Sequence, residues 1–141
     1  MSGPNGTHLA IKPGGSGDVT DSHVVWKNGR CTSFVPSAIR VGDRYYIADD
    51  KGIGSCLDAH TGKTLWRKRF GDKFTASPVA ADGKVFFTNE AGSTLVLDAT
   101  QSDYQELARN EIGEEVFALA AIAQGRFFVR TAKSLVCIGT K

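Results

Sequence analysis

The chain lacks the features that mark several large classes of protein. No apolar run approaches the roughly 20 residues of a membrane-spanning helix, so we expect no membrane insertion. The N-terminus has neither the basic start nor the apolar stretch of a signal peptide, and no nearby cysteine could accept a lipid. Seventeen basic and fifteen acidic residues are interspersed, and without a basic stripe we expect no nucleic-acid partner.

Catalytic and metal-binding patterns are also scarce. No Cys-x-x-Cys pair exists, and His8, His23 and His60 stand on separate segments, so no zinc site is predicted. A Gly-x-Ser-x-Gly elbow is absent. The glycine-rich segment 13–22 is interpreted as a flexible loop between two strands, since no helix is expected after it to bind phosphate. We therefore expect no cofactor and no enzymatic activity.

What the chain does contain is an internal repeat. Sliding the sequence against itself by about forty residues aligns similar stretches, as propeller blades do. Trp26 aligns with Trp66, and Leu107 is placed at the same position one repeat later. The other matching stretches are 44–47, 84–87 and 126–129, and also 56–59, 96–99 and 137–140.

Each repeat is predicted to form four short strands. The expected strands are 7–12, 23–28, 35–41, 44–48, 55–59, 64–69, 76–81, 84–89, 94–99, 105–110, 117–123, 126–130 and 135–140. The two-residue turns that join first to second strands are Gly42-Asp43, Asp82-Gly83 and Gln124-Gly125. The second strands are apolar on both faces, as in a sheet packed between two others.

The predicted fold is an all-β propeller of four-stranded antiparallel blades, with about three blades in the chain. The single repeat domain, 1–141, divides into a partial blade at 7–30, blades at 31–71 and 72–113, and a three-stranded blade at 114–141. Cys56 and Cys137 fall at equivalent positions two blades apart, beyond the roughly 7 Å that a disulfide spans between Cα atoms. Together with Cys31, they are interpreted as small buried hydrophobic residues.

Two stretches carry a family resemblance. The stretch LDAHTGKTLW at 57–66 resembles the tryptophan-docking motif of pyrroloquinoline-quinone-like repeats, and ASPVAADGKV at 76–85 is also typical of them. These repeats are found in quinoprotein dehydrogenases and in the propeller lipoprotein of outer-membrane assembly. The resemblance covers 7–141 and implies a propeller from an extracytoplasmic parent. The dehydrogenases have adjacent cysteines against the quinone, and here no two cysteines are adjacent.

Five residues are predicted to dock one blade on the next: Trp26, Asp58, Gly62, Trp66 and Asp98. Asp58 can accept backbone N–H groups across its turn, and Gly62 can adopt a left-handed conformation. The Trp66 ring is expected to be buried against the neighbouring blade, with its indole N–H bound to a carbonyl, and Trp26 to do the same one blade earlier. The alternative is a tryptophan at a substrate site.

Two functions from different classes remain. The first is a non-catalytic scaffold that binds a protein or peptide and either self-assembles into a ring or is a portion of a larger propeller. The second is a quinone- or metal-binding redox module. The residues expected to flank a central channel are Arg30, Asp49, Asp50, Lys73, Asn89, Glu90 and Arg130. The alternative for this group is solvated turn residues.

The incomplete ends of the repeat predict assembly with other copies of the chain. Ring propellers have four to eight blades, so two copies would give a permitted six-bladed ring, and three copies would give nine. A homodimer is favoured and a homotrimer stays open. The segment 23–28 can supply the outer strand that the C-terminal blade needs. The segment 7–12 then competes with 135–140 for the third position in that blade, or adds a fifth strand.

Overall fold

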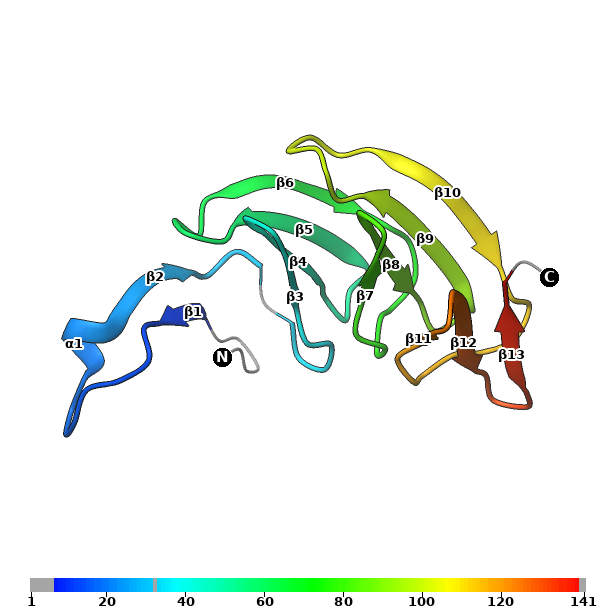
Figure 1. Ribbon diagram of the computed structural model, residues 1–141, viewed down its shortest axis with the longest axis horizontal. Coiled ribbons are helices and arrows are strands. Elements are labelled where there is room, and N and C mark those ends of the chain that lie inside the picture. Colours follow the sequence, from blue (N-terminus) through cyan, green and yellow to red (C-terminus); the bar gives the residue numbers. More distant parts are fainter. Residues whose placement is uncertain (1–6, 32, 140–141) are drawn as a thin grey trace.

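The computed structural model describes residues 7–31 and 33–139, whose sheets follow one another along an arc (Figure 1). The elements are β1 (His8–Ile11), α1 (Thr20–His23), β2 (Val24–Asn28), β3 (Ile39–Val41), β4 (Arg44–Ala48), β5 (Ile53–Asp58), β6 (Thr64–Arg69), β7 (Val79–Ala81), β8 (Lys84–Thr88), β9 (Ser93–Asp98), β10 (Glu106–Glu111), β11 (Ala121–Ala123), β12 (Arg126–Arg130) and β13 (Leu135–Ile138). The predicted all-β fold is confirmed.

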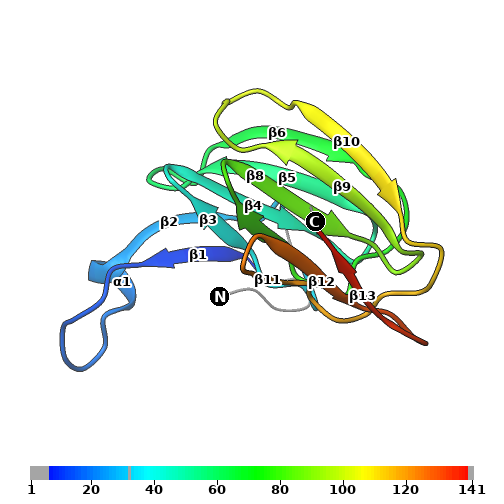
Figure 2. The ribbon, with the colours of Figure 1, turned by 45° about the vertical axis from the view of Figure 1, so that its right-hand side comes forward.

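The strands form four antiparallel sheets in chain order. Blade I has the two strands β1 and β2, blade II runs β3-β4-β5-β6, blade III runs β7-β8-β9-β10, and blade IV has β11-β12-β13. Blade I therefore contributes a third and an outer strand, and blade IV contributes the first three strands. The two partial blades lie at opposite ends of the arc in Figure 1, and the turned view of Figure 2 brings blade IV to the front.

The inner strands begin later than the sequence predicts. The strands β3, β7 and β11 have three residues each, because the residues before them do not join the ladder. Pro36 and Pro78 precede the first two and have no N–H to donate. Before β11, the side chains of Phe117 and Leu119 are exposed instead of packed. The last predicted strand ends at Ile138, and its predicted end, Thr140, lies outside the described residues.

One helical turn forms where the sequence predicts only loop. The N–H groups of Ser22 and His23 donate to the carbonyl of Val19, and Asp18 Oδ1 accepts the N–H of Thr20. The prediction that no helix follows the glycine run is therefore wrong. His23, predicted as the first residue of the outer strand, instead ends α1.

The first and second strands of the blades are joined as predicted by two-residue turns. Val41 pairs with Arg44, Ala81 with Lys84, and Ala123 with Arg126. Asp82-Gly83 and Gln124-Gly125 have positive φ at both residues, as a type I′ turn requires. Such turns match the right-handed twist of the strands and so set the register of each blade.

The hydrophobic core is divided among the boundaries between blades. Between blades I and II it contains Trp26, Cys31, Ile47 and Leu57. Between blades II and III it is larger and aromatic, with Tyr46, Phe70, Phe74 and Phe87 among its members. Between blades III and IV it shrinks to Val116, Ala120 and Val129. The second and third strands are apolar on both faces because each middle blade has two neighbours.

The three cysteines are free, and they differ in exposure. Cys31 and Cys56 are buried, but Cys137 is exposed. The prediction that Cys137 is a buried hydrophobic residue is wrong, because β13 is the edge of a blade with no fourth strand in the described part of the chain. Cys56 behaves as predicted, and burial raises the pKa of its thiol to about 11.

Candidate functional site: a loop face and an interblade groove

Trp26 docks blade I on the turn between the third and outer strands of blade II. Its side chain is 9% exposed, and its Nε1 donates to the carbonyl of Ala59 over 3.0 Å. The indole lies on Gly62, which has φ +69°. A Cβ at that position would stand 2.5 Å from the ring. Gly62 therefore allows both the left-handed turn and the close approach of the ring.

Asp58 and Asp98 hold the equivalent turns of blades II and III. Asp58 Oδ1 accepts the N–H groups of His60 and Thr61 and the Thr61 hydroxyl. Asp98 Oδ1 accepts the N–H and the hydroxyl of Thr100 at 2.7 and 2.6 Å. These hydroxyl and N–H donors hold the pKa of both carboxyl groups below the usual range, because they stabilise the charged form.

Trp66 docks differently from the prediction. Its side chain is half-buried, and its neighbours are the rings of Tyr46, Phe70 and Tyr104 instead of a carbonyl acceptor. The ring of Tyr104 meets it edge-on, with centroids 5.2 Å apart. Blade III replaces the glycine turn of blade II with a longer one that ends in Tyr104, and this aromatic side chain takes over the docking contact.

The predicted place of Leu107 in the repeat is wrong by one residue. Cys56 faces Trp66 in blade II, and its equivalent Val96 faces Ala108 in blade III. Leu107 is the extra residue of a β-bulge that recurs in every outer strand, at Val25, Leu65 and Leu107. The three bulged side chains are exposed on the rim of the arc.

The turns between second and third strands share one face with the loops that connect the blades. Backbone hydrogen bonds join these segments across blade boundaries. Glu90 N–H donates to the carbonyl of Lys73, Val116 N–H donates to Glu90, and Ala132 N–H donates to Glu115. The loop face, defined here as 49–52, 71–77, 89–92, 113–119 and 131–134, is therefore a connected surface.

Two of the predicted channel residues meet in a pocket on the loop face. Lys73 and Glu90 line a hollow of about 260 Å³ together with Asp72, Ala91 and Glu115. Glu90 is positioned by the Thr75 hydroxyl, which donates to its Oε1 over 2.6 Å. One basic and three acidic side chains, from a turn of blade III and the loops before and after that blade, therefore converge on one opening.

Asp49 and Asn89 cap turns of the loop face. Asp49 Oδ1 accepts the N–H groups of Lys51 and Ile53, and Asn89 Oδ1 accepts the N–H of Ser93. Thr131 does the same in blade IV. These contacts support the structural alternative for Asp49 and Asn89.

The other predicted channel residues are separated. Asp50 is half-buried in the turn after β4, and Arg130 is exposed at the end of β12. Arg30 lies away from the loop face, in a hollow of about 380 Å³ on the rim. That hollow is also lined by Lys27, Asn28, Gly29, Gly62, Lys63 and Thr64.

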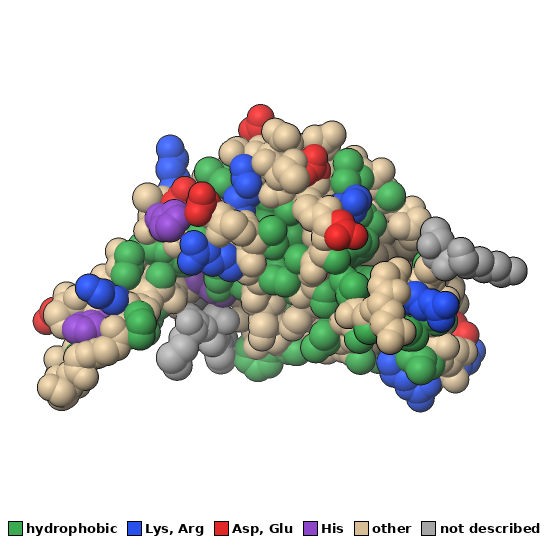
Figure 3. Space-filling view, in the orientation of Figure 1, with side chains coloured by type: hydrophobic (Ala, Val, Ile, Leu, Met, Phe, Trp, Pro, Cys, Tyr) green, Lys and Arg blue, Asp and Glu red, His purple; other side chains and the backbone are tan. Residues whose placement is uncertain are grey.

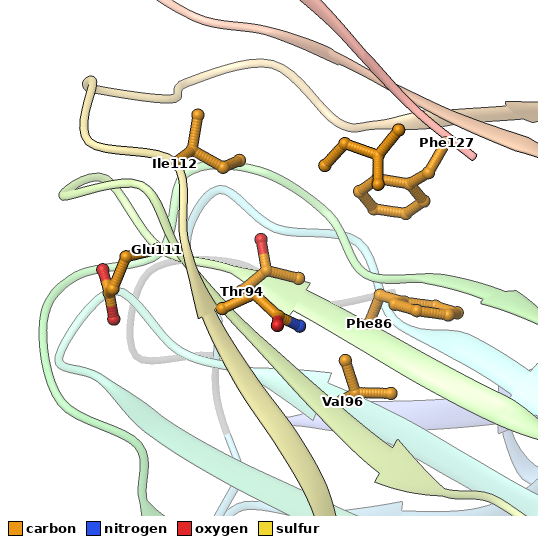
Figure 4. Close-up of a pocket in the computed structure, with 8 residues that line it drawn as sticks. Phe86, Thr94, Val96, Glu111, Ile112 and Phe127 are labelled. Atoms are coloured by element: carbon orange, nitrogen blue, oxygen red, sulfur yellow. The ribbon is translucent and has the colours of Figure 1, made fainter. Parts of the chain in front are cut away.

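A groove between blades III and IV, which the sequence reasoning missed, is the most apolar opening described here. It has a volume of about 250 Å³ and is lined by Phe86, Thr94, Val96, Asn110, Glu111, Ile112, Phe127 and Ile138. Phe86 and Phe127 approach across it from the two blades (Figure 4), with ring centroids 5.1 Å apart.

The groove exists because the aromatic side chains of one boundary are replaced by smaller ones at the next. By strand register, Ala108 of blade III occupies the position that Trp66 has in blade II. Four residues after that pair, Ile112 occupies the position that corresponds to Phe70. Four residues further on, Val116 occupies the position that corresponds to Phe74. At the boundary of blades II and III, the Phe70 ring covers Gly54, where a Cβ would stand 1.9 Å from it. At the next boundary Thr94 and Ile112 leave that space open. Aligning the repeat by strand register would have revealed the change.

The described part of the chain contains neither a cluster of metal ligands nor a membrane-spanning helix. Among residues 7–31 and 33–139, no three His, Cys, Asp or Glu side chains are placed to hold a metal ion. No described helix has the length and apolar character needed to cross a bilayer.

Comparison with known proteins decides the family. The profile described as outer membrane protein assembly factor BamB matches residues 17–105. The protein of that name from Burkholderia pseudomallei is 33% identical over 119 residues, which is 80% of this chain and 29% of that protein. The chain belongs to the BamB family. It spans less than a third of the length of this BamB relative.

Solved structures support the propeller fold of this BamB-family chain. BamB from Moraxella catarrhalis superposes with a TM-score of 0.68 at 17% identity, over 82% of this chain and 36% of that one. A quinohemoprotein alcohol dehydrogenase from Pseudomonas putida also has a TM-score of 0.68, at 16% identity, over 91% of this chain and 26% of that one. At these identities the likeness concerns the fold alone.

Proposed function

We propose that this BamB-family chain is a non-catalytic scaffold whose loop face binds an extended segment of a protein engaged in outer-membrane assembly. The observation that carries the proposal is the pocket where Lys73, from the loop between blades II and III, and Glu90 of blade III meet Asp72 and Glu115. Its mixed charges suit the polar backbone and charged side chains of a peptide. The connected loops behind it form a preorganised support, which lowers the entropic cost of binding.

The family supports the choice of partner. The matching profile and the Burkholderia relative are both described as outer membrane protein assembly factors. We therefore also propose that the chain acts outside the cytoplasm, at the membrane whose proteins the family assembles. The likeness to a quinohemoprotein dehydrogenase adds no cofactor to this proposal, since it concerns the fold alone.

Site-specific crosslinking tests where the partner binds. A photoreactive amino acid at Lys73 should capture an envelope protein, whereas the same group at Leu65, exposed on the rim, should capture little. In binding measurements with the captured protein, Lys73→Glu should weaken affinity by about tenfold, because it turns the pocket wholly acidic. Capture at Leu65 but not at Lys73 would move the site to the rim and overturn the proposal.

A spectrum and a metal analysis test the absence of redox chemistry. Purified protein should show only the absorbance of its aromatic residues and no stoichiometric metal. A bound chromophore or one metal ion per chain would instead favour a quinone- or metal-binding redox module.

We further propose that two chains close a six-bladed ring. The support is the exposure of apolar side chains on both terminal blades (Figure 3). Those exposed at the two ends include Ile11 in blade I, and Phe117, Leu119, Ile122, Leu135 and Ile138 in blade IV. Apolar side chains gathered on an exposed face mark interaction sites. Light scattering should give twice the 15.1 kDa of one chain, and a monomer at micromolar concentration would contradict the ring.

A further inference from the structure

A hollow on the rim gathers positive charge at the boundary of blades I and II. It has a volume of about 380 Å³ and lies between the end of β2 and the turn that joins β5 to β6. Three exposed basic residues line it, Lys27, Arg30 and Lys63, and none of its lining residues is acidic. The strands β2 and β6 run along the convex side of the arc, so blades packed against either end of the arc would leave the hollow open (Figure 1).

The three positive charges have no local counter-charge. Within residues 7–31 and 33–139, the side chains of Lys27, Arg30 and Lys63 form no ion pair and donate no hydrogen bond. In the next blade Arg67, which corresponds to Lys27 by strand register, lies 4.0 Å from an oxygen of Asp49. Like charges that converge without a partner create a positive potential, which favours an anion between them.

Asn28 fixes the walls of the hollow. Its Nδ2 donates to the carbonyl of Gly62 over 2.8 Å and to the hydroxyl of Thr64 over 3.2 Å, on either side of Lys63. Its Oδ1 accepts the N–H of Arg30 over 2.9 Å. One half-buried amide therefore ties together the two segments that carry the basic residues, and this preorganisation lowers the cost of binding an anion.

The corresponding place at the boundary of blades II and III has a different charge. By the register of the third and outer strands, Glu106 corresponds to Thr64, and Gln105 corresponds to Lys63. Glu106 forms an ion pair with Arg109 at 3.2 Å. The blade repeat by itself therefore does not require a basic hollow, which belongs to one boundary alone among the described blades.

We propose that this hollow binds the phosphate group of a phosphate monoester. Such a group carries about −1.5 to −2 charges at pH 7 and has three strong acceptor oxygens. The guanidinium of Arg30 can pair with two of these oxygens at once, and the two lysines supply point charges. A single carboxylate would leave two of the three positive charges unmatched. The volume also leaves room beside the phosphate for the group that carries it.

Titration with inorganic phosphate, followed by NMR, tests the site. The backbone amide signals of Arg30 and Lys63 should shift and saturate with phosphate, but not with chloride at equal ionic strength. Lys63→Gln introduces the residue of the next boundary and should raise the dissociation constant about tenfold. The matched control is Lys68→Gln, which removes the same charge from an exposed position on β6 outside the hollow. It should change the constant by less than about twofold.

Asn28→Ala distinguishes a preorganised site from a surface that is only basic. It keeps all three positive charges but removes the hydrogen bonds of the amide, and should weaken phosphate binding about fivefold. Circular dichroism checks its fold, and the exposed Lys63→Gln keeps the test valid if Asn28→Ala unfolds. Equal weakening by Lys63→Gln and Lys68→Gln, or amide signals that do not saturate, would refute the site.

Vesicle flotation identifies the source of the phosphate. Vesicles of phosphatidylcholine with phosphatidic acid should bind the parent and not Lys63→Gln if the ligand is a lipid headgroup. A chain that binds inorganic phosphate but neither these vesicles nor vesicles of phosphatidylcholine alone has a soluble phosphate ester as its ligand. A glutamate-rich peptide that binds the hollow more tightly than phosphate would overturn the choice of ligand. The hollow is separate from the loop face, so crosslinking at Lys73 judges the protein-binding role independently.

Discussion

At the scale of single residues, blade docking depends on what the receiving turn presents. Trp26 lies flat on Gly62 and donates to the carbonyl of Ala59, whereas Trp66 meets the edge of Tyr104. The turn of blade II provides backbone contact at Gly62 and a hydrogen-bond acceptor at Ala59, whereas Tyr104 provides apolar area. One sequence position thus supports two docking modes, and the turn of the following blade decides between them.

Substitution of Gly62 measures the first mode. Gly62→Ala should lower the free energy of unfolding by about 2 kcal/mol, from left-handed strain and from displacement of the Trp26 ring. The matched control is Gly17→Ala, since Gly17 also has φ +69° but nothing within 4 Å of an added Cβ. It should cost about 1 kcal/mol. Equal costs in denaturant unfolding would show that the Trp26 contact carries no energy.

Truncation of Trp66 measures the second mode. Trp66→Ala should cost about 3 kcal/mol, the low end for a large aromatic side chain, because the ring is half-buried. Leu65→Ala is the control, and as an exposed bulge residue it should cost less than about 0.5 kcal/mol. A melting temperature for Trp66→Ala within two degrees or so of the parent would indicate that Tyr104 and Phe70 close the gap unaided.

At the scale of elements, the third strands of the terminal blades, β1 and β13, differ from the third strands of blades II and III, because each has one unpaired edge. The third strands of blades II and III are almost wholly buried, while β13 has three exposed residues of four. Edge strands of this kind are available for pairing with another chain. The strand β1 is the exception, since His8 packs into blade II and hydrogen-bonds the Tyr45 hydroxyl over 3.1 Å.

Acid should loosen β1. Burial lowers the pKa of His8 below its ordinary value of 6.5, because desolvation penalises the charged imidazolium. Tyr45, the titratable group in contact with it, is uncharged at these pH values, and burial raises its pKa. The stability that His8 contributes is present above about pH 6.5 and is lost as the pH falls through the lower folded pKa, because the released histidine binds the proton more readily.

Denaturant unfolding at pH 7.5 and 5.5 checks this expectation. The parent should be less stable at the lower pH, and His8→Leu should reduce that dependence, since it places at this position the residue that β13 has there. A parent and a variant with the same pH dependence would assign it to other groups. In that case Asp58 and Asp98 are the next candidates at still lower pH, because their pKa values are also depressed.

At the scale of the whole molecule, the arc consists of sheets whose cores lie between them. Each of the three described cores is built from two neighbouring blades, so each blade buries its apolar side chains against its neighbours. Stability is therefore expected to rise as boundaries are added, and we propose that further boundaries form at the outward faces of the terminal blades.

Thermal unfolding checks that expectation. If two chains share boundaries, a tenfold rise in protein concentration should raise the melting temperature by a few degrees, because assembly is linked to folding. A melting temperature independent of concentration would show that each chain folds alone.

The sequence by itself determined the period, the strand order and the type of turn. Repeat spacing, alternating apolar runs and residues such as Gly83 and Gly125 act locally, and local signals can be read along the chain. The same reasoning predicted docking roles for Trp26, Asp58 and Gly62, because the docking motif lies within one repeat. It failed by one residue at Ala108, since a β-bulge changes which side chain faces the neighbour without changing the count of residues.

Only the tertiary structure decided which side chains from different blades meet. In the sequence these residues were alike as polar loop residues. In the structure Lys73 and Glu90 line one pocket, and Arg30 lies on the rim. The side chains of Asp49 and Asn89 accept backbone N–H groups of their own turns. The groove beside Ile112 likewise depends on Phe127 and Ile138 from the next blade. Such sites arise from volume and contact across a boundary, and these are properties of packed surfaces that no single stretch of sequence contains.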